Sequence, residues 1–119
     1  MSQVLVIEDS PAIALLLRRR LEMAGHSVEV IANGLQALER LDPQALPDIV
    51  LADFQMPGID GIETMRRIRS DHPGLPVILV TAQNLAPEAR READAVVDKP
   101  IEFNQLFGAI SRLTAPEQS

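Results

Sequence analysis

Five short runs of apolar residues alternate along the chain with segments in which apolar residues recur every three or four positions. The runs are rich in β-branched residues, which is typical of buried strands, and the other segments have the period of amphipathic helices. The predicted strands cover residues 3–8, 28–31, 48–53, 75–80 and 95–98. Strands that alternate with helices favour one parallel sheet with helices on both faces. The pattern therefore predicts a βα unit repeated five times.

Capping residues mark where several of the predicted helices begin. Ser10 followed by Pro11 is an N-cap with proline at the first helical position, and Asn33 and Asp60 are suitable caps for the second and third helices. Residues 84–92 are polar, rich in arginine and interrupted by a proline. The apolar positions expected on the first two helices are Ile13, Leu16, Leu17, Leu21 and Ala24, and then Leu35, Leu38 and Leu41.

Composition restricts the class of protein. A length of 119 residues fits one domain, 1–119, and residues 114–119 are either a tail that frays or the end of a piece of a longer chain. A net charge of −6, with three Phe and no Trp or Tyr, disfavours direct binding of nucleic acid. The absence of Cys excludes a disulfide framework and a thiolate zinc site. No signal peptide precedes the first strand, and the apolar run 12–17 is too short to span a membrane, so we expect a cytoplasmic location.

Acidic residues follow two of the predicted strands. Glu8 and Asp9 come directly after the first apolar run, and Asp53 ends the third. The carboxyl ends of parallel strands meet at one edge of the sheet, where open α/β sheets place their chemistry. Carboxylates that lie this close repel one another unless a cation is bound, and hard oxygen ligands suit Mg²⁺. The sequence therefore predicts a divalent cation beside a reactive aspartate.

The same edge offers groups that suit phosphoryl transfer. The carboxylate of Asp53 can accept a phosphoryl group as an acyl phosphate. Lys99 follows the fifth strand and can neutralise charge on the phosphoryl oxygens, and Thr81 ends the fourth strand with a hydroxyl. Taken singly, each of these residues is as well explained by a helix cap, a turn or a solvated side chain.

Four motifs in order carry a resemblance to a known family. They are Val6-Ile7-Glu8-Asp9, the segment 53–58 (Asp-Phe-Gln-Met-Pro-Gly), Thr81-Ala82 and Lys99-Pro100. The chain resembles the receiver domain of two-component response regulators over essentially its whole length. The resemblance implies a (βα)5 doubly wound, flavodoxin-like fold with strand order 2-1-3-4-5.

The resemblance also implies a function and a set of site residues. Asp53 would accept phosphate from the phosphohistidine of a histidine kinase or histidine phosphotransfer protein, with Mg²⁺ or Mn²⁺, and switch a downstream protein target. Glu8, Asp9, Asp53 and the backbone carbonyl of Gln55 would bind the metal. Thr81 and Lys99 would contact the phosphoryl group, and the Lys99-Pro100 bond would be cis. Helix 1, with Arg18 and Arg19, would dock the kinase. The chain would be a signalling domain that catalyses only its own phosphorylation and dephosphorylation.

Two features depart from the family pattern. Val96 stands where receivers commonly have an aromatic residue, and the segment from Thr81 to Lys99 is shorter than usual by roughly one helical turn. We therefore expect a short or displaced fourth helix, and we expect neither the conventional dimer of helix 4, strand 5 and helix 5 nor conventional Thr–aromatic switching. Gln55 and Gln83 occupy positions that tune hydrolysis of the acyl phosphate, where an amide either orients a water or blocks it.

Three alternatives remain at this point. Val96 also fits a degenerate receiver that acts as a passive docking module. A flavodoxin-like cofactor binder would need a Gly-rich or hydroxyl-rich phosphate loop after the first strand, but residues 8–12 read Glu-Asp-Ser-Pro-Ala. A phosphatase similar to the haloacid dehalogenases would need Asp-x-Asp at the first strand, which this chain lacks.

Overall fold

The computed structural model describes residues 2–82 and 84–115, which form a five-stranded parallel sheet in the order β2-β1-β3-β4-β5. The strands are β1 (Gln3–Ile7), β2 (Ser27–Ile31), β3 (Ile49–Asp53), β4 (Val77–Thr81) and β5 (Ala95–Asp98). The helices are α1 (Pro11–Met23), α2 (Gly34–Arg40), α3 (Gly61–Asp71), α4 (Pro87–Glu92) and α5 (Phe103–Thr114). This arrangement confirms the predicted (βα)5 fold and its strand order. The expectations for Gln83 and for residues 116–119 of the tail lie outside the described residues.

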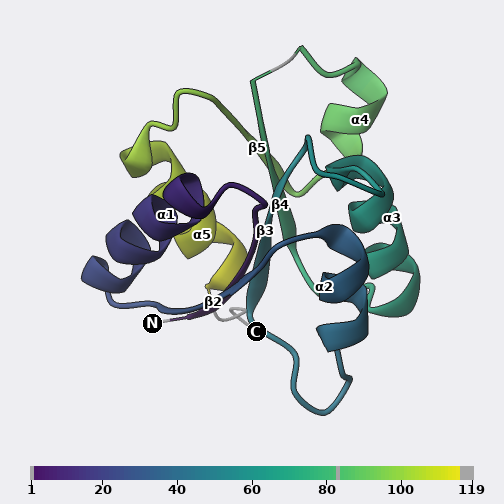
Figure 1. Ribbon diagram of the computed structural model, residues 1–119, viewed down its shortest axis with the longest axis horizontal. Coiled ribbons are helices and arrows are strands. Elements are labelled where there is room, and N and C mark those ends of the chain that lie inside the picture. The colour runs from purple at the N-terminus through teal and green to yellow at the C-terminus, as the bar shows by residue number, and fades with distance from the viewer. Residues whose placement is uncertain (1, 83, 116–119) are drawn as a thin grey trace.

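The helices form two layers, one on each face of the sheet. Figure 1 shows α1 and α5 on one side of the strands and α2, α3 and α4 on the other. Alternate residues of a strand point to opposite faces, so β1 supplies both cores. Val4 and Val6 pack with α1 and α5, whereas Leu5 and Ile7 pack with α2 and α3. Because both faces are covered, the open sites of the sheet are its edges and the ends of its strands.

The helix caps agree with the sequence-based expectations. The Ser10 hydroxyl accepts a hydrogen bond from the Ile13 N–H at 3.4 Å, so Ser10 rather than Asp9 caps α1. Asn33 accepts from the Gln36 N–H and Asp60 accepts from the Glu63 N–H, each at 2.9 Å. Asp9 is exposed just before the Ser10 cap, so its carboxylate is available at the end of β1.

Helix α4 is short, as the sequence predicted. It has six residues, and of these only Ala89 is buried. Leu85 and Ala93, which flank the helix, pack against the core on the α2 and α3 side. Two ion pairs at the surface add to this anchoring: Glu92 pairs with Arg66 of α3 at 2.8 Å, and Arg90 pairs with Asp98 of β5 at 3.0 Å.

Two leucines of the predicted apolar helix positions lie at the surface rather than in the core. Leu16 and Leu35 are each 49 % exposed. At about 100° per residue, Leu16 lies about 200° around α1 from Ala14, which faces the sheet. A stripe of Ala14, Leu17 and Leu21 already fills that face. Together with Leu15, also 49 % exposed, Leu16 gives α1 a second apolar stripe that faces solvent.

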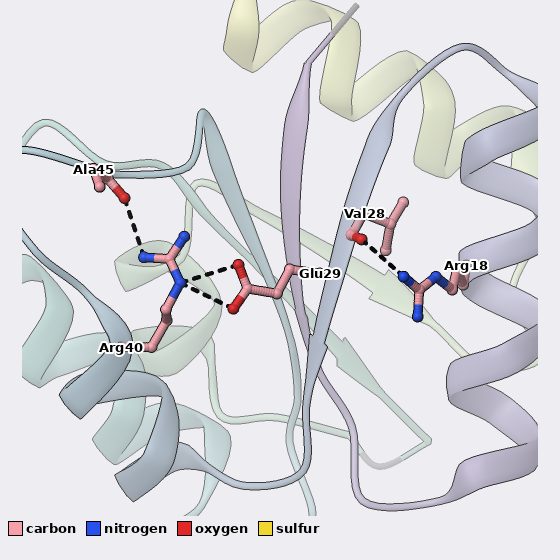
Figure 2. Close-up of polar contacts among 5 residues, drawn as sticks. All are labelled: Arg18, Val28, Glu29, Arg40 and Ala45. Atoms are coloured by element: carbon pink, nitrogen blue, oxygen red, sulfur yellow. Dashed lines mark hydrogen bonds and ion pairs between the residues drawn. The ribbon is translucent and has the colours of Figure 1, made fainter.

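The edge strand β2 is flanked by two arginines, one from each layer. Figure 2 shows Arg18 of α1 donating to the Val28 carbonyl at 3.5 Å on one side of the strand. On the other side Arg40 of α2 binds both carboxylate oxygens of Glu29, at 2.9 and 3.0 Å, and donates to the Ala45 carbonyl at 3.1 Å. Charged side chains along an edge strand discourage pairing with another chain.

Among the described residues, no helix has the length and apolar character needed to cross a bilayer.

The buried and the exposed stripe of α1 predict different effects of leucine-to-alanine substitution on stability. We expect Leu21→Ala, which empties a fully buried site, to lower the free energy of unfolding by about 2–5 kcal/mol. Leu16→Ala removes a half-exposed side chain, so the change should stay within about 0.5 kcal/mol. Urea unfolding followed by far-ultraviolet circular dichroism measures both. A large loss of stability in Leu16→Ala would contradict the assignment of the outer stripe.

Candidate functional site

The acidic residues meet at the carboxyl edge of the sheet. Ile7 of β1 pairs with Ala52 of β3. The next residues along the chain, Glu8 and Asp53, therefore lie side by side at the carboxyl ends of the two strands. The carboxylates of Glu8, Asp9 and Asp53 each offer an oxygen, and these oxygens lie within 4.8 Å of one another. Glu8 and Asp53 are buried, at 4 and 7 % exposure, and Asp9 is exposed. The structure thus brings together three of the residues that the sequence singled out.

Lys99 reaches the same place from the end of β5. Its ammonium Nζ lies 3.0 Å from Asp53 Oδ1, and its backbone N–H donates to the Thr81 carbonyl at 2.8 Å. The Lys99-Pro100 peptide bond is cis, as expected. Thr81 ends β4 next to this pair in the sheet, one residue beyond the Val80 that pairs with Asp53, and it is 1 % exposed. The Lys99 ammonium and the Thr81 hydroxyl are therefore carried by residues at strand ends near Asp53.

A cleft of about 730 Å³ opens over the carboxylates. The loops that follow β1 and β3 form its walls, and Gln55 lies among its lining residues. Ser10 and Ile13 also line the cleft, although the sequence predicted only a helix cap and an apolar helix position for them. Phe54, Met56 and Pro57 of the 53–58 motif line it as well, and the sequence indicated no site role for these side chains. Asp60 also lines the cleft, while its carboxylate caps α3.

The electrostatics of the cleft favour a cation. Burial, followed by the nearby charge of Asp53, raises the pKa of Glu8. The Ser10 N–H, which donates to Glu8 Oε2 at 3.0 Å, and the more distant Lys99 act in the opposite direction. Three carboxylates with one ammonium leave an excess of negative charge in a partly buried site. The donors are all hard oxygens, which fits Mg²⁺ or Mn²⁺.

A smaller apolar hollow of about 280 Å³ adjoins this cleft at Ile13. Lys99 and Pro100 line it together with Ile101 and Phe103 on one side and the Ile13 and Leu16 side chains of α1 on the other. Ile13 lines both the cleft and the hollow. The outer apolar stripe of α1 is therefore continuous with the mouth of the candidate site.

Comparison with known proteins was made for the whole chain. Residues 4–111 match the family described as the response regulator receiver domain. Response regulator MprA from Mycobacterium sp. (strain KMS) is 35 % identical over 123 residues, which cover 98 % of this chain and 53 % of that protein. MprA from Mycobacterium bovis (strain BCG / Pasteur 1173P2) is 34 % identical and is covered to 54 %. The chain thus spans about half the length of the curated relatives it matches.

Solved structures share the fold over nearly the full chain. The response regulator TrrA from Thermotoga maritima, in complex with Mg²⁺-BeF, has a TM-score of 0.86 and 31 % identity, covering 95 % of this chain and 99 % of that one. TrrA in complex with the histidine kinase ThkA has a TM-score of 0.87 and 31 % identity, covering 97 % and 100 %. On the family match and these identities, the chain belongs to the response regulator receiver domain family.

Proposed function

We propose that Asp53 accepts a phosphoryl group from the phosphohistidine of a histidine kinase or a histidine phosphotransfer protein. The observation that carries the proposal is the contact of 3.0 Å between the Lys99 ammonium and the buried carboxylate of Asp53, within a cleft that also holds two further carboxylates. The Asp53 oxygen forms a bond to phosphorus, and the bond between phosphorus and the imidazole nitrogen breaks. The nitrogen keeps the electron pair of that bond, and the product is an acyl phosphate.

The residues around Asp53 have separate roles in this proposal. Lys99 holds the carboxylate in place and then neutralises negative charge on the phosphoryl oxygens. The hydroxyl of Thr81, at the end of the neighbouring strand, offers a hydrogen bond to another of those oxygens. Both residues are set on strand ends that the buried sheet fixes, so the groups are oriented before the phosphoryl group arrives.

Glu8, Asp9, Asp53 and the backbone carbonyl of Gln55 would hold Mg²⁺ or Mn²⁺. When bound, the metal would neutralise charge that develops on the phosphoryl group. Support comes from the three convergent carboxylate oxygens, of which those of Glu8 and Asp53 are buried. The TrrA structure in complex with Mg²⁺-BeF comes from a protein that is 31 % identical to this chain.

The outer face of α1 is proposed as the surface that receives the histidine-bearing partner. Arg18 and Arg19 are both exposed on α1, and Arg18 also donates to the Val28 carbonyl (Figure 2), so their shared role in partner choice stays a prediction. The guanidinium of Arg20 lies 4.1 Å from the centre of the Phe103 ring. Within residues 2–82 and 84–115, Arg19 is the member of this arginine run whose side chain has no such contact. We therefore propose that the partner presents an apolar surface to α1, with an acidic group that lies opposite Arg19.

A second candidate function is a passive docking module, which is favoured by one observation. Val96, the residue that replaces an aromatic, is half-buried against the core on the α2 and α3 side. It has no ring that could change rotamer when the site is phosphorylated. The two functions differ in whether Asp53 carries a phosphoryl group at all, so labelling separates them.

We expect acetyl phosphate with Mg²⁺ to add one phosphoryl group to the wild-type chain, as measured by intact mass. EDTA or the substitution Asp53→Asn should abolish the adduct. Asp60→Asn is the matched control, because Asp60 lines the same cleft and asparagine is an equally good helix cap. Persistent labelling of Asp53→Asn would overturn the assignment. A wild-type chain that binds Mg²⁺ but is never labelled would favour the passive docking module.

Lys99→Ala should slow labelling by acetyl phosphate by roughly 100-fold or more, because a cation that stabilises the transferred group is lost. The same substitution leaves three carboxylates without their ammonium, so Mg²⁺ should raise the melting temperature more in the variant than in the wild type. Labelling rates and thermal unfolding at fixed Mg²⁺ concentration measure these effects. An unchanged labelling rate would exclude the proposed role of Lys99.

Arg19→Glu should slow phosphotransfer from a phosphorylated histidine kinase several-fold at low ionic strength, and less at high salt, because charge at the rim of an interface steers association. Labelling by acetyl phosphate should be unchanged, since Arg19 lies outside the cleft. Arg91→Glu, an exposed arginine on α4, is the control for net charge. Equal effects of the two substitutions on phosphotransfer would contradict docking on α1.

A further inference from the structure

The backbone that carries Asp53 is held from two sides. On one side, the Phe54 N–H donates to the Val80 carbonyl of β4 at 2.8 Å. On the other side, the Gly61 N–H at the start of α3 donates to the Phe54 carbonyl, also at 2.8 Å. The end of β3 is therefore fixed between the neighbouring strand and the first residue of α3. Asp53 directly precedes Phe54, and Gln55 directly follows it, so both proposed ligands adjoin this fixed residue.

Gly61 permits a contact that no other residue could make. A Cβ atom at this position would lie 2.6 Å from the Asp53 carbonyl oxygen and 2.8 Å from the Phe54 Cα. Both neighbours are backbone atoms, so no change of side-chain rotamer could relieve the overlap. A methyl group here would push the end of β3 and the start of α3 apart.

The conformation of Gly61 does not by itself require glycine. The glycines with positive φ in the described chain are Gly25 and Gly58, at 97° and 82°, whereas Gly61 opens α3 without one. Alanine has a higher helix propensity than glycine, so an isolated helix would gain from the exchange. The close approach to the end of β3 is thus the feature that excludes a side chain.

We infer that Gly61 is a positioning residue for the metal ligands of the cleft, an inference that rests on the function proposed above. The proposed ligands follow two strands: Glu8 and Asp9 come after β1, whereas Asp53 ends β3 and Gln55 lies in the loop two residues later. Gly61 at the start of α3 contacts the β3 side of the set, through the backbone of Asp53 and Phe54. A displacement at Gly61 therefore changes the distance between the two halves.

The relative affinity for Mg²⁺ and Ca²⁺ depends on the distance between the ligands that follow β1 and those at the end of β3. Mg²⁺ demands near-ideal octahedral geometry with short bonds to oxygen, whereas Ca²⁺ accepts longer bonds and irregular geometry. A cleft that is slightly too wide should therefore lose Mg²⁺ before it loses Ca²⁺. A variant that is merely less stable would bind both ions as before in its folded fraction, so the ratio of the two affinities separates positioning from stability.

The test compares Gly61→Ala with Gly34→Ala, both made in a Gly108→Ala background that compensates for lost stability. Gly108 is exposed within α5, and its added Cβ would meet nothing within 4 Å, so alanine should stabilise that helix. Gly34 is the matched control: it is also a buried glycine that opens a helix, but its Cβ would meet the side chains of Thr64 and Ile59. Calorimetric titration with Mg²⁺ and with Ca²⁺ is suitable because the chain has no Trp or Tyr.

In Gly61→Ala we expect Mg²⁺ affinity to fall by roughly 10–100-fold, as for other changes that misplace metal ligands, and Ca²⁺ affinity to fall clearly less. Gly34→Ala should lower thermal stability and leave the ratio of affinities at the background value. Three results would overturn the inference about Gly61 but leave the proposed metal site standing. They are retained Mg²⁺ affinity in Gly61→Ala, equal losses of affinity for both ions, and the same change in the ratio of affinities in Gly34→Ala. A background chain that binds neither ion would overturn the proposed metal site, and the inference with it.

Discussion

The repulsion among three carboxylates at one edge of the sheet is the constraint on which the rest of the site depends. Two unit charges about 4 Å apart interact with about 4 kcal/mol at an effective dielectric constant of 20. Lys99, at 3.0 Å from Asp53, offsets part of this repulsion, while burial and then the charge of Asp53 raise the pKa of Glu8. The carboxylates stay close together because two strands that are buried at their carboxyl ends, β1 and β3, fix the backbone that carries them. A divalent cation is the natural complement to such a site.

Much of this arrangement could be predicted from the sequence because it depends on short-range signals. Apolar runs identify the strands, and capping residues such as Ser10 and Asp60 identify where helices begin. Parallel strands then bring their carboxyl ends to one edge regardless of side-chain detail. The convergence of Glu8, Asp9, Asp53 and Lys99 follows from that topology alone.

Other features could not be predicted, because they depend on packing that periodicity does not resolve. Leu16 and Leu17 are adjacent and equally apolar, and only the position of α1 on the sheet decides which one is buried. The arginines at 18–20 look alike in the sequence, yet Arg18 contacts β2 and Arg20 contacts α5, whereas Arg19 has no such contact within residues 2–82 and 84–115. Gly61 looks like a turn glycine until the backbone of Asp53 and Phe54 is seen to lie against it.

Helix α4 shows how the two departures from the family pattern belong together. A short helix with one buried alanine has little apolar contact of its own, so the pairs Arg66–Glu92 and Arg90–Asp98 supplement the packing of Leu85 and Ala93, which flank it. Asp98 directly precedes Lys99, which contacts Asp53. The ion pair to α4 and the contact to the candidate phosphorylation site thus come from consecutive residues at the end of β5, Asp98 and Lys99. In a chain with Val96 in place of an aromatic ring, this peptide is a direct link between the cleft and an ion pair of α4. Because exposed ion pairs are individually weak, α4 is anchored less firmly than the helices that bury an apolar face.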